Sequence, residues 1–354
     1  MLIEAVFIAT LVTVLLILAL RPFALAVGLV DRPGGRKKHV GVVPVTGGIA
    51  MYFGAVFGLS MLDGPLSSHS MFLLAGGLLA LVGVIDDRFH LTATIKLIAQ
   101  LAAVLIMVFG ADLIMRDIGD PLWVGRISLG PMALIVSALI YVTVINAYNF
   151  IDGLDGLAGC MALIALLAIA YVAGLWTTTG AFVAVLAAVV VGYLIFNLPI
   201  GRHRPFRTFM GDTGSTFLGF SIAWATVSVC QGDARVISPV YGLWFAALPL
   251  YDLLTCVVRR SLKGRSPFDP GRDHFHHVLR DADMSARKVA AVLVALQLFY
   301  ALIAITAHNI GVADPLMFAA WAVLGLSQYA IVRGIADLYR RFRLTQTATG
   351  LDGR

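Results

Sequence analysis

Charged side chains are scarce in this chain. Asp, Glu, Lys and Arg make up 13% of its 354 residues, against about 25% in a typical soluble domain. Polar linkers and low-complexity tracts are also missing, and 60% of the residues are hydrophobic. These features exclude an ordinary soluble enzyme and predict one integral membrane domain over residues 1–354.

Cysteine is equally rare. The three residues of this type, Cys160, Cys230 and Cys256, lie within apolar runs and lack the spacing of a zinc site, so we expect them to pack inside the protein or against lipid. Lys and Arg outnumber Asp and Glu by 26 to 20, a net charge of +6. We interpret this excess as attraction to anionic lipid head groups, and we expect no nucleic-acid partner.

The apolar runs predict an all-α, polytopic integral membrane protein with about 11 transmembrane helices. The first run begins with Glu4 rather than Lys or Arg, and no small-residue cleavage site follows it. We therefore expect a retained span instead of a signal peptide. The expected spans lie near residues 3–21, 46–62, 70–85, 95–110, 131–146, 157–174, 180–196, 214–230, 239–257, 288–307 and 315–335.

The basic residues indicate how these spans are oriented. The first loop carries Arg32, Arg36, Lys37 and Lys38, so the positive-inside rule places this loop in the cytoplasm and the N-terminus outside. Alternation then places the C-terminus in the cytoplasm. All but three of the 26 basic residues follow this scheme, and the exceptions in outside loops are Arg116, Arg126 and Arg235. In one outside loop, residues 123–129 alternate in polarity and predict a small hairpin.

Polar clusters interrupt the apolar pattern at five expected cytoplasmic loops, at about 22–45, 86–95, 146–157, 197–213 and 257–288. A charge near hydrocarbon costs about 2.5–3.5 kcal/mol on insertion scales, so retained clusters indicate a functional site. Structural roles are open too. Asp86-Asp87-Arg88 could be a helix end with a local ion pair, and Gly211-Asp212-Thr213-Gly214-Ser215 could be a turn in which Asp or Thr caps the next helix.

The third cluster carries evenly spaced oxygen donors. Asn146, Asn149 and Asp152 lie three residues apart, which favours one face of a helix. Amide and carboxylate oxygens of this kind suit Mg²⁺. A polar turn is the alternative interpretation.

The fifth loop contains His274, His276 and His277 after several basic residues. They could form a zinc site, but no cysteine accompanies them and the other clusters favour a hard metal. Cationic donors that bind a diphosphate or a sugar fit better, and a solvated basic loop explains only the Arg and Lys. Asp252, near the inner end of a span, is expected to pair with Arg259 or Arg260.

Together, these motifs resemble the polyprenyl-phosphate N-acetylhexosamine-1-phosphate transferases, glycosyltransferase family 4, over about residues 31 to 290. Single motifs are weak, but six in this order on one face are highly specific. The segments that carry the resemblance are 36–39 with 44–48, 83–89, 146–156, 209–215, 248–252, and 259–268 through 274–277.

The resemblance implies a reaction in which undecaprenyl phosphate attacks the β-phosphorus of a UDP-N-acetylhexosamine and UMP leaves. It favours UDP-GlcNAc as donor, which would make the product undecaprenyl-diphosphate-GlcNAc, the primer of O-antigen or related cell-envelope polysaccharides. UDP-GalNAc, UDP-QuiNAc and UDP-FucNAc are alternative donors. It further implies Mg²⁺ as cofactor, with Mn²⁺ as substitute, and a bacterial inner-membrane protein whose active site faces the cytoplasm. The oligomeric state is open, and a homo-oligomer is compatible with the sequence.

Roles follow from the resemblance, position by position. Four carboxylates are implied in catalysis: Asp86, Asp87, Asp152 and Asp155. A metal ion is implied at Asp212, with Asn149 as partner. Seven residues are implied in substrate binding: Lys38, Asn197, Phe209, Arg260, His274, His276 and His277.

Within these roles, Asp86 and Asp87 would position or deprotonate the lipid phosphate. Positioning is favoured, because a phosphate monoester has its second pKa near 6. Phe209 would stack on uracil, and the residues of the last loop would grip the sugar phosphate.

Two departures from the family pattern matter. Val278 follows the histidines where the related phospho-MurNAc-pentapeptide transferases have an acidic residue, which argues against that substrate. Val40 stands where a Lys often occurs, so Lys37 or Lys38 would replace it. A polytopic transporter is the rival class, but internal repeats and paired broken helices are not evident in the sequence.

Overall fold

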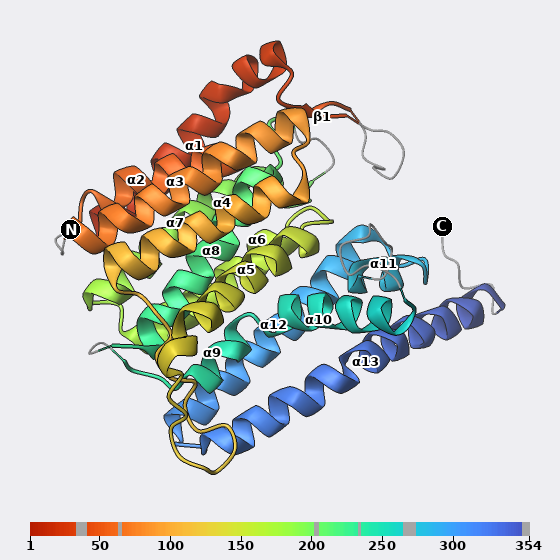
Figure 1. Cartoon of the computed structure of the whole chain (residues 1–354). Coiled ribbons are helices and arrows are strands. Elements are labelled where there is room, and N and C mark those ends of the chain that lie inside the picture. The colour runs from red at the N-terminus through yellow and green to blue at the C-terminus, as the bar shows by residue number, and fades with distance from the viewer. Residues whose placement is uncertain (33–40, 63–65, 202–204, 233–234, 265–273, 349–354) are drawn as a thin grey trace.

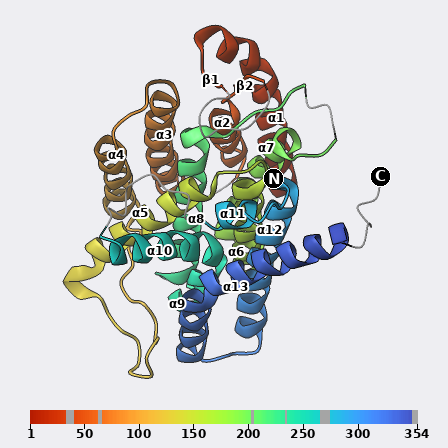
Figure 2. The ribbon, with the colours of Figure 1, turned by 90° about the vertical axis from the view of Figure 1, so that its right-hand side faces the viewer.

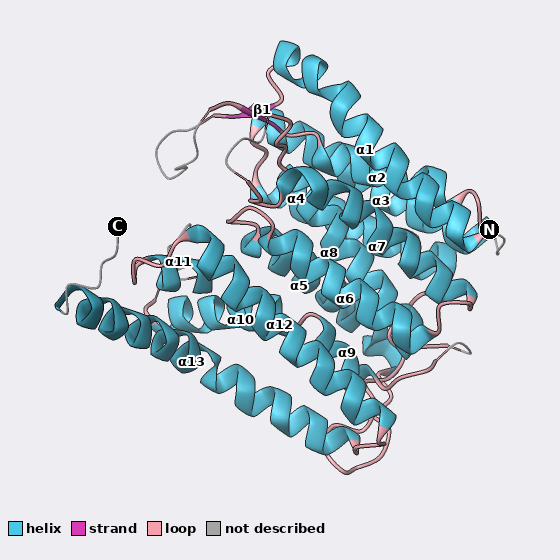
Figure 3. Ribbon diagram, turned by 180° about the vertical axis from the view of Figure 1, so that it is seen from behind, coloured by secondary structure: helices cyan, strands magenta, loops and turns pink. Residues whose placement is uncertain are grey.

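The computed structural model describes residues 1–32, 41–62, 66–201, 205–232, 235–264 and 274–348, of which 66–68 and 342–348 as backbone only. The chain forms a bundle of helices (Figure 1), and Figure 3 shows one short strand pair at its edge. The helices are α1 (Leu2–Val27), α2 (Gly47–Leu59), α3 (Leu66–Phe89), α4 (Ala93–Leu105), η1 (Ile106–Gly110), η2 (Gly130–Met132), α5 (Ala133–Ile151), α6 (Leu157–Ala173), α7 (Thr178–Asn197), α8 (Gly211–Cys230), α9 (Pro239–Phe245), α10 (Ala247–Leu262), α11 (Phe275–Arg280), α12 (Ala286–Asn309) and α13 (Asp314–Ala348). Strands β1 (Val30–Asp31) and β2 (Val43–Pro44) pair antiparallel, with Val30 opposite Pro44.

The all-α, polytopic fold that the sequence predicts is confirmed. Within the described residues, eight helices are long and apolar enough to cross a membrane, or nine if the bent pair α9–α10 is counted as one span. Helices α2 and α6 are shorter apolar segments. Each of the eleven expected spans therefore coincides with a helical segment, although some of these segments are short or bent.

Helix α8 forms the centre of the bundle. It packs against α2, α3, α5 and α6, and most of its residues are buried inside the protein. Glycine permits these close approaches: a Cβ on Gly48 of α2 would lie 2.3 Å from the backbone nitrogen of Gly214, and one on Gly83 of α3 would lie 2.4 Å from the Cα of Thr213. The first turn of α8, which carries the candidate metal ligand, is thus held between two neighbouring helices.

The span expected over 239–257 is broken rather than continuous. Helices α9 and α10 meet at an angle of 86°, and Figure 2 shows α10 crossing its neighbours instead of running along them. Pro249 explains the break, because in a continuous helix its ring would clash with the carbonyl of Phe245, four residues earlier. Gln297 of α12 bridges the gap: its amide nitrogen donates to the Phe245 carbonyl (2.9 Å) and its oxygen accepts from Leu248 N (3.0 Å).

The polar clusters gather at one end of the bundle. The carboxyl ends of α3, α5, α7 and α10 and the amino ends of α6 and α8 lie there, together with α11 (Figure 1). The hairpin predicted near 123–129 is at the opposite end, where Asp117 pairs with Ser128 in an antiparallel bridge and Ile127 N donates to Gly119 O at 2.8 Å. Loops far apart in sequence are therefore brought to one face.

Candidate active site

Asp87 holds the start of α8. Its carboxylate accepts hydrogen bonds from the backbone N–H of Asp212 (2.7 Å) and of Thr213 (3.2 Å), and from the Thr213 hydroxyl (2.7 Å). Gly211, at φ +67°, admits this contact, because a Cβ there would lie 2.3 Å from Asp87 Oδ2. The expectation that Asp212 or Thr213 caps α8 is wrong, since the capping carboxylate comes from α3.

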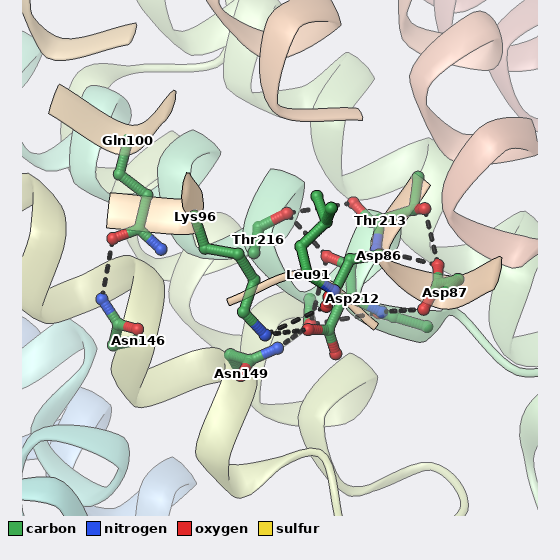
Figure 4. A network of polar contacts seen from close by, with 12 residues as sticks. Asp86, Asp87, Leu91, Lys96, Gln100, Asn146, Asn149, Asp212, Thr213 and Thr216 are labelled. Atoms are coloured by element: carbon green, nitrogen blue, oxygen red, sulfur yellow. Dashed lines mark hydrogen bonds and ion pairs between the residues drawn. The ribbon is translucent and has the colours of Figure 1, made fainter. Parts of the chain in front are cut away.

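Asp86 faces the other way, toward α4 (Figure 4). Lys96 Nζ lies 3.0 Å from Asp86 Oδ2 and 2.8 Å from Asp212 Oδ2, so one ammonium group joins two carboxylates from two helices. The backbone N–H of Leu91 donates to the remaining oxygen of Asp86 at 2.6 Å. Asp86 is 6% exposed, while Asp212 is more open to ligands, with 31% of its side chain exposed.

The three donors at 146–152 do not share one direction. The Asn146 amide donates to Gln100 of α4 (2.9 Å), whereas that of Asn149 donates to Ser215 of α8 (2.9 Å); Figure 4 shows the two apart. A step of three residues falls about 60° short of a full helical turn, so positions 146 and 152 drift apart around the axis. α5 also ends at Ile151, leaving Asp152 beyond its last turn. Asn149 is the donor placed beside Asp212.

Two further carboxylates line the turn between α5 and α6. Burial, and then the charges of Asp212, Asp155 and Asp87, raise the pKa of Asp152 to about 8. Asp155 pairs with Arg207 at 2.7 Å, and the guanidinium of Arg207 lies 4.7 Å from the ring centre of Phe209. The site therefore concentrates negative charge, and a bound cation would relieve it.

Asn197 braces this turn. Its side-chain oxygen accepts from Gly156 N (2.7 Å), and its amide donates to Thr208 O (2.9 Å). Both polar groups of this 3% exposed residue are thus engaged inside the protein. We therefore expect Asn197 to position the 208–210 segment and Phe209, rather than to contact the substrate itself.

Asp252 holds the loop that contains the histidines and does not pair with any arginine that the structure describes. His274 Nδ1 lies 2.7 Å from Asp252 Oδ2, and Phe275 N donates to Oδ1 at 2.7 Å. The expected pairing of Asp252 with Arg259 or Arg260 is wrong. All three residues lie on α10, where Arg259 and Arg260 stand about 10–12 Å further along the helix axis than Asp252. Arg260 is 5% exposed in the last turn of α10.

His276 joins this loop to the α5–α6 turn. A Cβ on Gly153 would lie 2.5 Å from His276 Nε2. The His276 ring stacks on that of His274 at a centroid separation of 5.8 Å and lies tilted against that of His277 at 4.2 Å. Burial, and then His277 and His274, lower the pKa of His276 to about 3. It is thus neutral rather than the cationic donor we expected, and its Nδ1 has no hydrogen-bond partner among the described residues.

The geometry also bears on the zinc interpretation. Asp252, Cys256 and His274 place possible ligand atoms within 4.8 Å of one another, the one such group in the described part of the chain. However, two ligands bound to one Zn²⁺ at about 2.0 Å in tetrahedral geometry lie about 3.3 Å apart. The 2.7 Å separation of His274 Nδ1 and Asp252 Oδ2 instead fits a direct hydrogen bond.

Sequence reasoning missed two cations at the site. Lys96 and Arg207 each bind a carboxylate that the motifs identify. A signal for Lys96 was present, because it is the only charged residue in the apolar run 93–110 and charges in such runs are rarely idle. Arg207 carries no such signal, because other basic residues lie close to it in the sequence. Lys38 lies outside the described residues.

Comparison with known proteins identifies the family of the chain. Residues 69–230 match the model of Glycosyl transferase family 4. The chain is 34% identical over 288 residues to the undecaprenyl-phosphate alpha-N-acetylglucosaminyl 1-phosphate transferase of Salmonella typhi, covering 80% of this chain and 77% of that protein.

Proteins of the same name in Yersinia pestis and Pasteurella multocida are each 31% identical. The first match covers 91% of this chain and 90% of the relative, and the second covers 93% and 94%. At this identity and coverage, the chain belongs to glycosyl transferase family 4.

Proposed function

We propose that the protein transfers N-acetylglucosamine 1-phosphate from UDP-GlcNAc to undecaprenyl phosphate, giving undecaprenyl-diphosphate-GlcNAc and UMP. The observation that carries this proposal is the network that joins Asp86, Asp87 and Asp212 at one end of a membrane bundle. Relatives over most of the chain carry the name of this transferase. The reaction would prime O-antigen or a related cell-envelope polysaccharide at the cytoplasmic face of the inner membrane.

A magnesium ion fits the donors present. Asp212 offers a partly exposed carboxylate, and Asn149 lies beside it with its amide nitrogen turned to Ser215, which leaves the amide oxygen available. Carboxylate and amide oxygens are hard ligands that favour Mg²⁺, with Mn²⁺ as substitute. When bound, the ion would neutralise the diphosphate and the developing charge on UMP.

The lipid acceptor has an apolar approach to this end of the bundle. A groove of about 460 Å³ between α4 and α5 is lined entirely by aliphatic side chains, including Leu97, Leu101 and Val142. Leu97 follows Lys96 directly, and Val142 lies one turn before Asn146. Isoprenoid units in this groove would place the phosphate near Lys96 and Asp86. An acceptor phosphate is mostly dianionic at pH 7, so these residues need only position it.

The donor contacts would come from the other side of the network. Phe209, beneath the Arg207 guanidinium, offers a flat face for uracil. Arg260 would donate hydrogen bonds to the sugar phosphate, and the histidines of the 274–277 segment would contact the sugar. The acceptor oxygen would attack the β-phosphorus, and the bond from that phosphorus to the bridging oxygen would break, so that UMP departs with the negative charge.

The test is turnover by the purified protein with undecaprenyl phosphate and Mg²⁺. UDP-GlcNAc, UDP-GalNAc, UDP-QuiNAc and UDP-FucNAc are offered separately, and both UMP and the lipid product are measured. We expect UDP-GlcNAc to give the highest kcat/KM. Preference for another donor would refute the sugar assignment, and release of UMP without lipid product would refute the transferase itself.

A further inference from the structure

Asp252 is a buried carboxylate that the network around Asp212 does not use. It lies on α10, just after the break from α9, and is fully buried. Oδ2 lies 2.7 Å from His274 Nδ1, and Oδ1 accepts from the backbone N–H of Phe275. A carboxylate can only accept hydrogen bonds, so the hydrogen of this pair resides on Nδ1. The other ring nitrogen, Nε2, is the one left for a ligand.

The ring that Asp252 binds is fixed in place as well. His274 lies 5.6 Å from Phe150 and 5.8 Å from His276 between ring centres, and its plane is within 6° of that of His276. His276 in turn touches Gly153 in the α5–α6 turn. His274 therefore belongs to the wall of the candidate active site, and its tautomer determines what that wall presents to a ligand.

We propose that Asp252 is a positioning residue for the donor. It holds His274 with Nδ1 protonated and turned inward, so that the unprotonated Nε2 accepts a hydrogen bond from a hydroxyl group on the sugar of the UDP-sugar. This inference rests on the proposed function for the identity of that ligand. The hydrogen bond itself is independent of it.

A purely structural role is the competing explanation. Asp252 also caps the first turn of α11 through Phe275 N, and removing a cap destabilises a helix. Asp252→Asn separates the two roles. The asparagine oxygen can still accept from Phe275 N, but the amide group on the other side is a donor. It forces His274 to give up its Nδ1 hydrogen, which exchanges the properties of the two ring nitrogens.

The experiment is a double-mutant cycle on Asp252→Asn and His274→Ala, with Leu253→Ala as a control on the same helix. We expect Asp252→Asn to lower kcat/KM for the donor at least about tenfold, with KM for undecaprenyl phosphate changed less than about twofold. In the His274→Ala background the same change should cost less than about twofold. If turnover is too slow to measure, the cycle uses Kd for the UDP-sugar. Normal kinetics in Asp252→Asn, or losses that multiply in the double mutant, would overturn the proposal.

A second measurement needs no substrate. In protein labelled with ¹⁵N-histidine, we expect a downfield Nδ1–H resonance that disappears in both Asp252→Asn and His274→Ala. Its persistence in Asp252→Asn would contradict the pairing even if that variant lost activity. If wild-type protein shows the resonance but uses no UDP-sugar, the proposed function fails while the pairing stands.

Discussion

At the scale of single residues, Asp86 and Asp87 adjoin in the chain but contact different helices. Asp87 binds the backbone at the start of α8, while Asp86 binds Lys96 of α4. Successive residues on a helix point about 100° apart, which is why one Asp-Asp pair can join two neighbours. Asp212 is tied to both carboxylates, through its backbone N–H and through Lys96. The pair therefore sets the position of the candidate metal ligand.

We predict that Asp212→Asn lowers turnover at least about 100-fold, because the loss of one ligand charge removes several kcal/mol of transition-state stabilisation. The variant should insert and elute as wild type does. Asp112→Asn, an exposed carboxylate at the opposite end of the bundle, serves as the matched control and should be neutral. Activity of Asp212→Asn above about a tenth of wild type at saturating Mg²⁺ would contradict the metal assignment.

A second prediction concerns Lys96, whose loss should not weaken the binding of Mg²⁺. Lys96→Gln removes the ammonium between Asp86 and Asp212, so the site becomes more negative. Turnover should fall at least about tenfold, whereas the Mg²⁺ concentration for half-maximal rate should not rise. Titration with Mg²⁺ measures both. Arg116→Gln, which breaks an ion pair at the other end, should change neither, and a raised Mg²⁺ requirement in Lys96→Gln would count against our assignment.

The pKa of His276, lowered to about 3 by burial and by His277 and His274, makes stability depend on pH. Between pH 6.5 and 3 the unfolded chain binds a proton at His276 that the folded chain does not. The contribution of this group to folding stability is therefore fully present above pH 6.5 and is lost as the pH falls toward 3. The slope from this group is at most about 1.4 kcal/mol per pH unit. Thermal unfolding from pH 7.5 to 5 should show a shallower decline in His276→Gln than in wild type. The exposed control His90→Asn should leave the decline unchanged, and an identical slope in His276→Gln would refute the prediction.

At the scale of helices, the sequence predicts which segments are helical better than it predicts where a helix bends. Apolar runs specify where α1 to α8 lie, because lipid and core alike require hydrophobic surface. The break between α9 and α10 was not predicted. Pro249 was visible in the sequence, but Gln297, which satisfies the freed groups of Phe245 and Leu248, lies some 50 residues away in the chain. The directions of Asn146 and Asp252 also depend on such distant partners, so the motifs alone could not predict the contacts of these residues.

The junction of α3 with α8 yields a prediction at this scale. Gly211→Ala places a methyl group 2.3 Å from Asp87 Oδ2 at φ +67°, so the capping carboxylate must move. Gly311→Ala is the matched control, because its φ is +72° and no atom lies within 4 Å of the new Cβ. Both variants carry backbone strain of about 1–2 kcal/mol. Only Gly211→Ala should lose activity, and its melting temperature should fall further; equal effects of the two would show that the contact with Asp87 is unimportant.

At the scale of the whole molecule, the candidate active site lies at one end of the bundle, here called the site end. The 111–130 loop lies at the opposite end, here called the closed end. At the closed end, the carboxylate of Asp117 binds Arg235 at 2.8 Å, and Gln231 donates to the Asp117 carbonyl at 3.0 Å, which ties the 111–130 loop to the end of α8. Charge counting predicted which end would face the cytoplasm, because basic residues concentrate in the loops of the site end. The bundle itself fixes only that the two ends are opposite.

Labelling of introduced cysteines tests the orientation. Val124→Cys lies in the hairpin of the closed end, where Val124 is 72% exposed, and Lys263→Cys lies just beyond α10 at the site end, also exposed. In intact cells a membrane-impermeant maleimide should react with the first and spare the second, and inverted vesicles should reverse the pattern. Native Cys230 and Cys256 are buried and Cys160 is half-buried, so wild type provides the background. Labelling of both positions from one side would disprove a span count that places them on opposite sides of the membrane. The reversed pattern would leave the bundle unchanged but would place the carboxylate network outside the cell. Cytoplasmic UDP-sugars could not reach the network there.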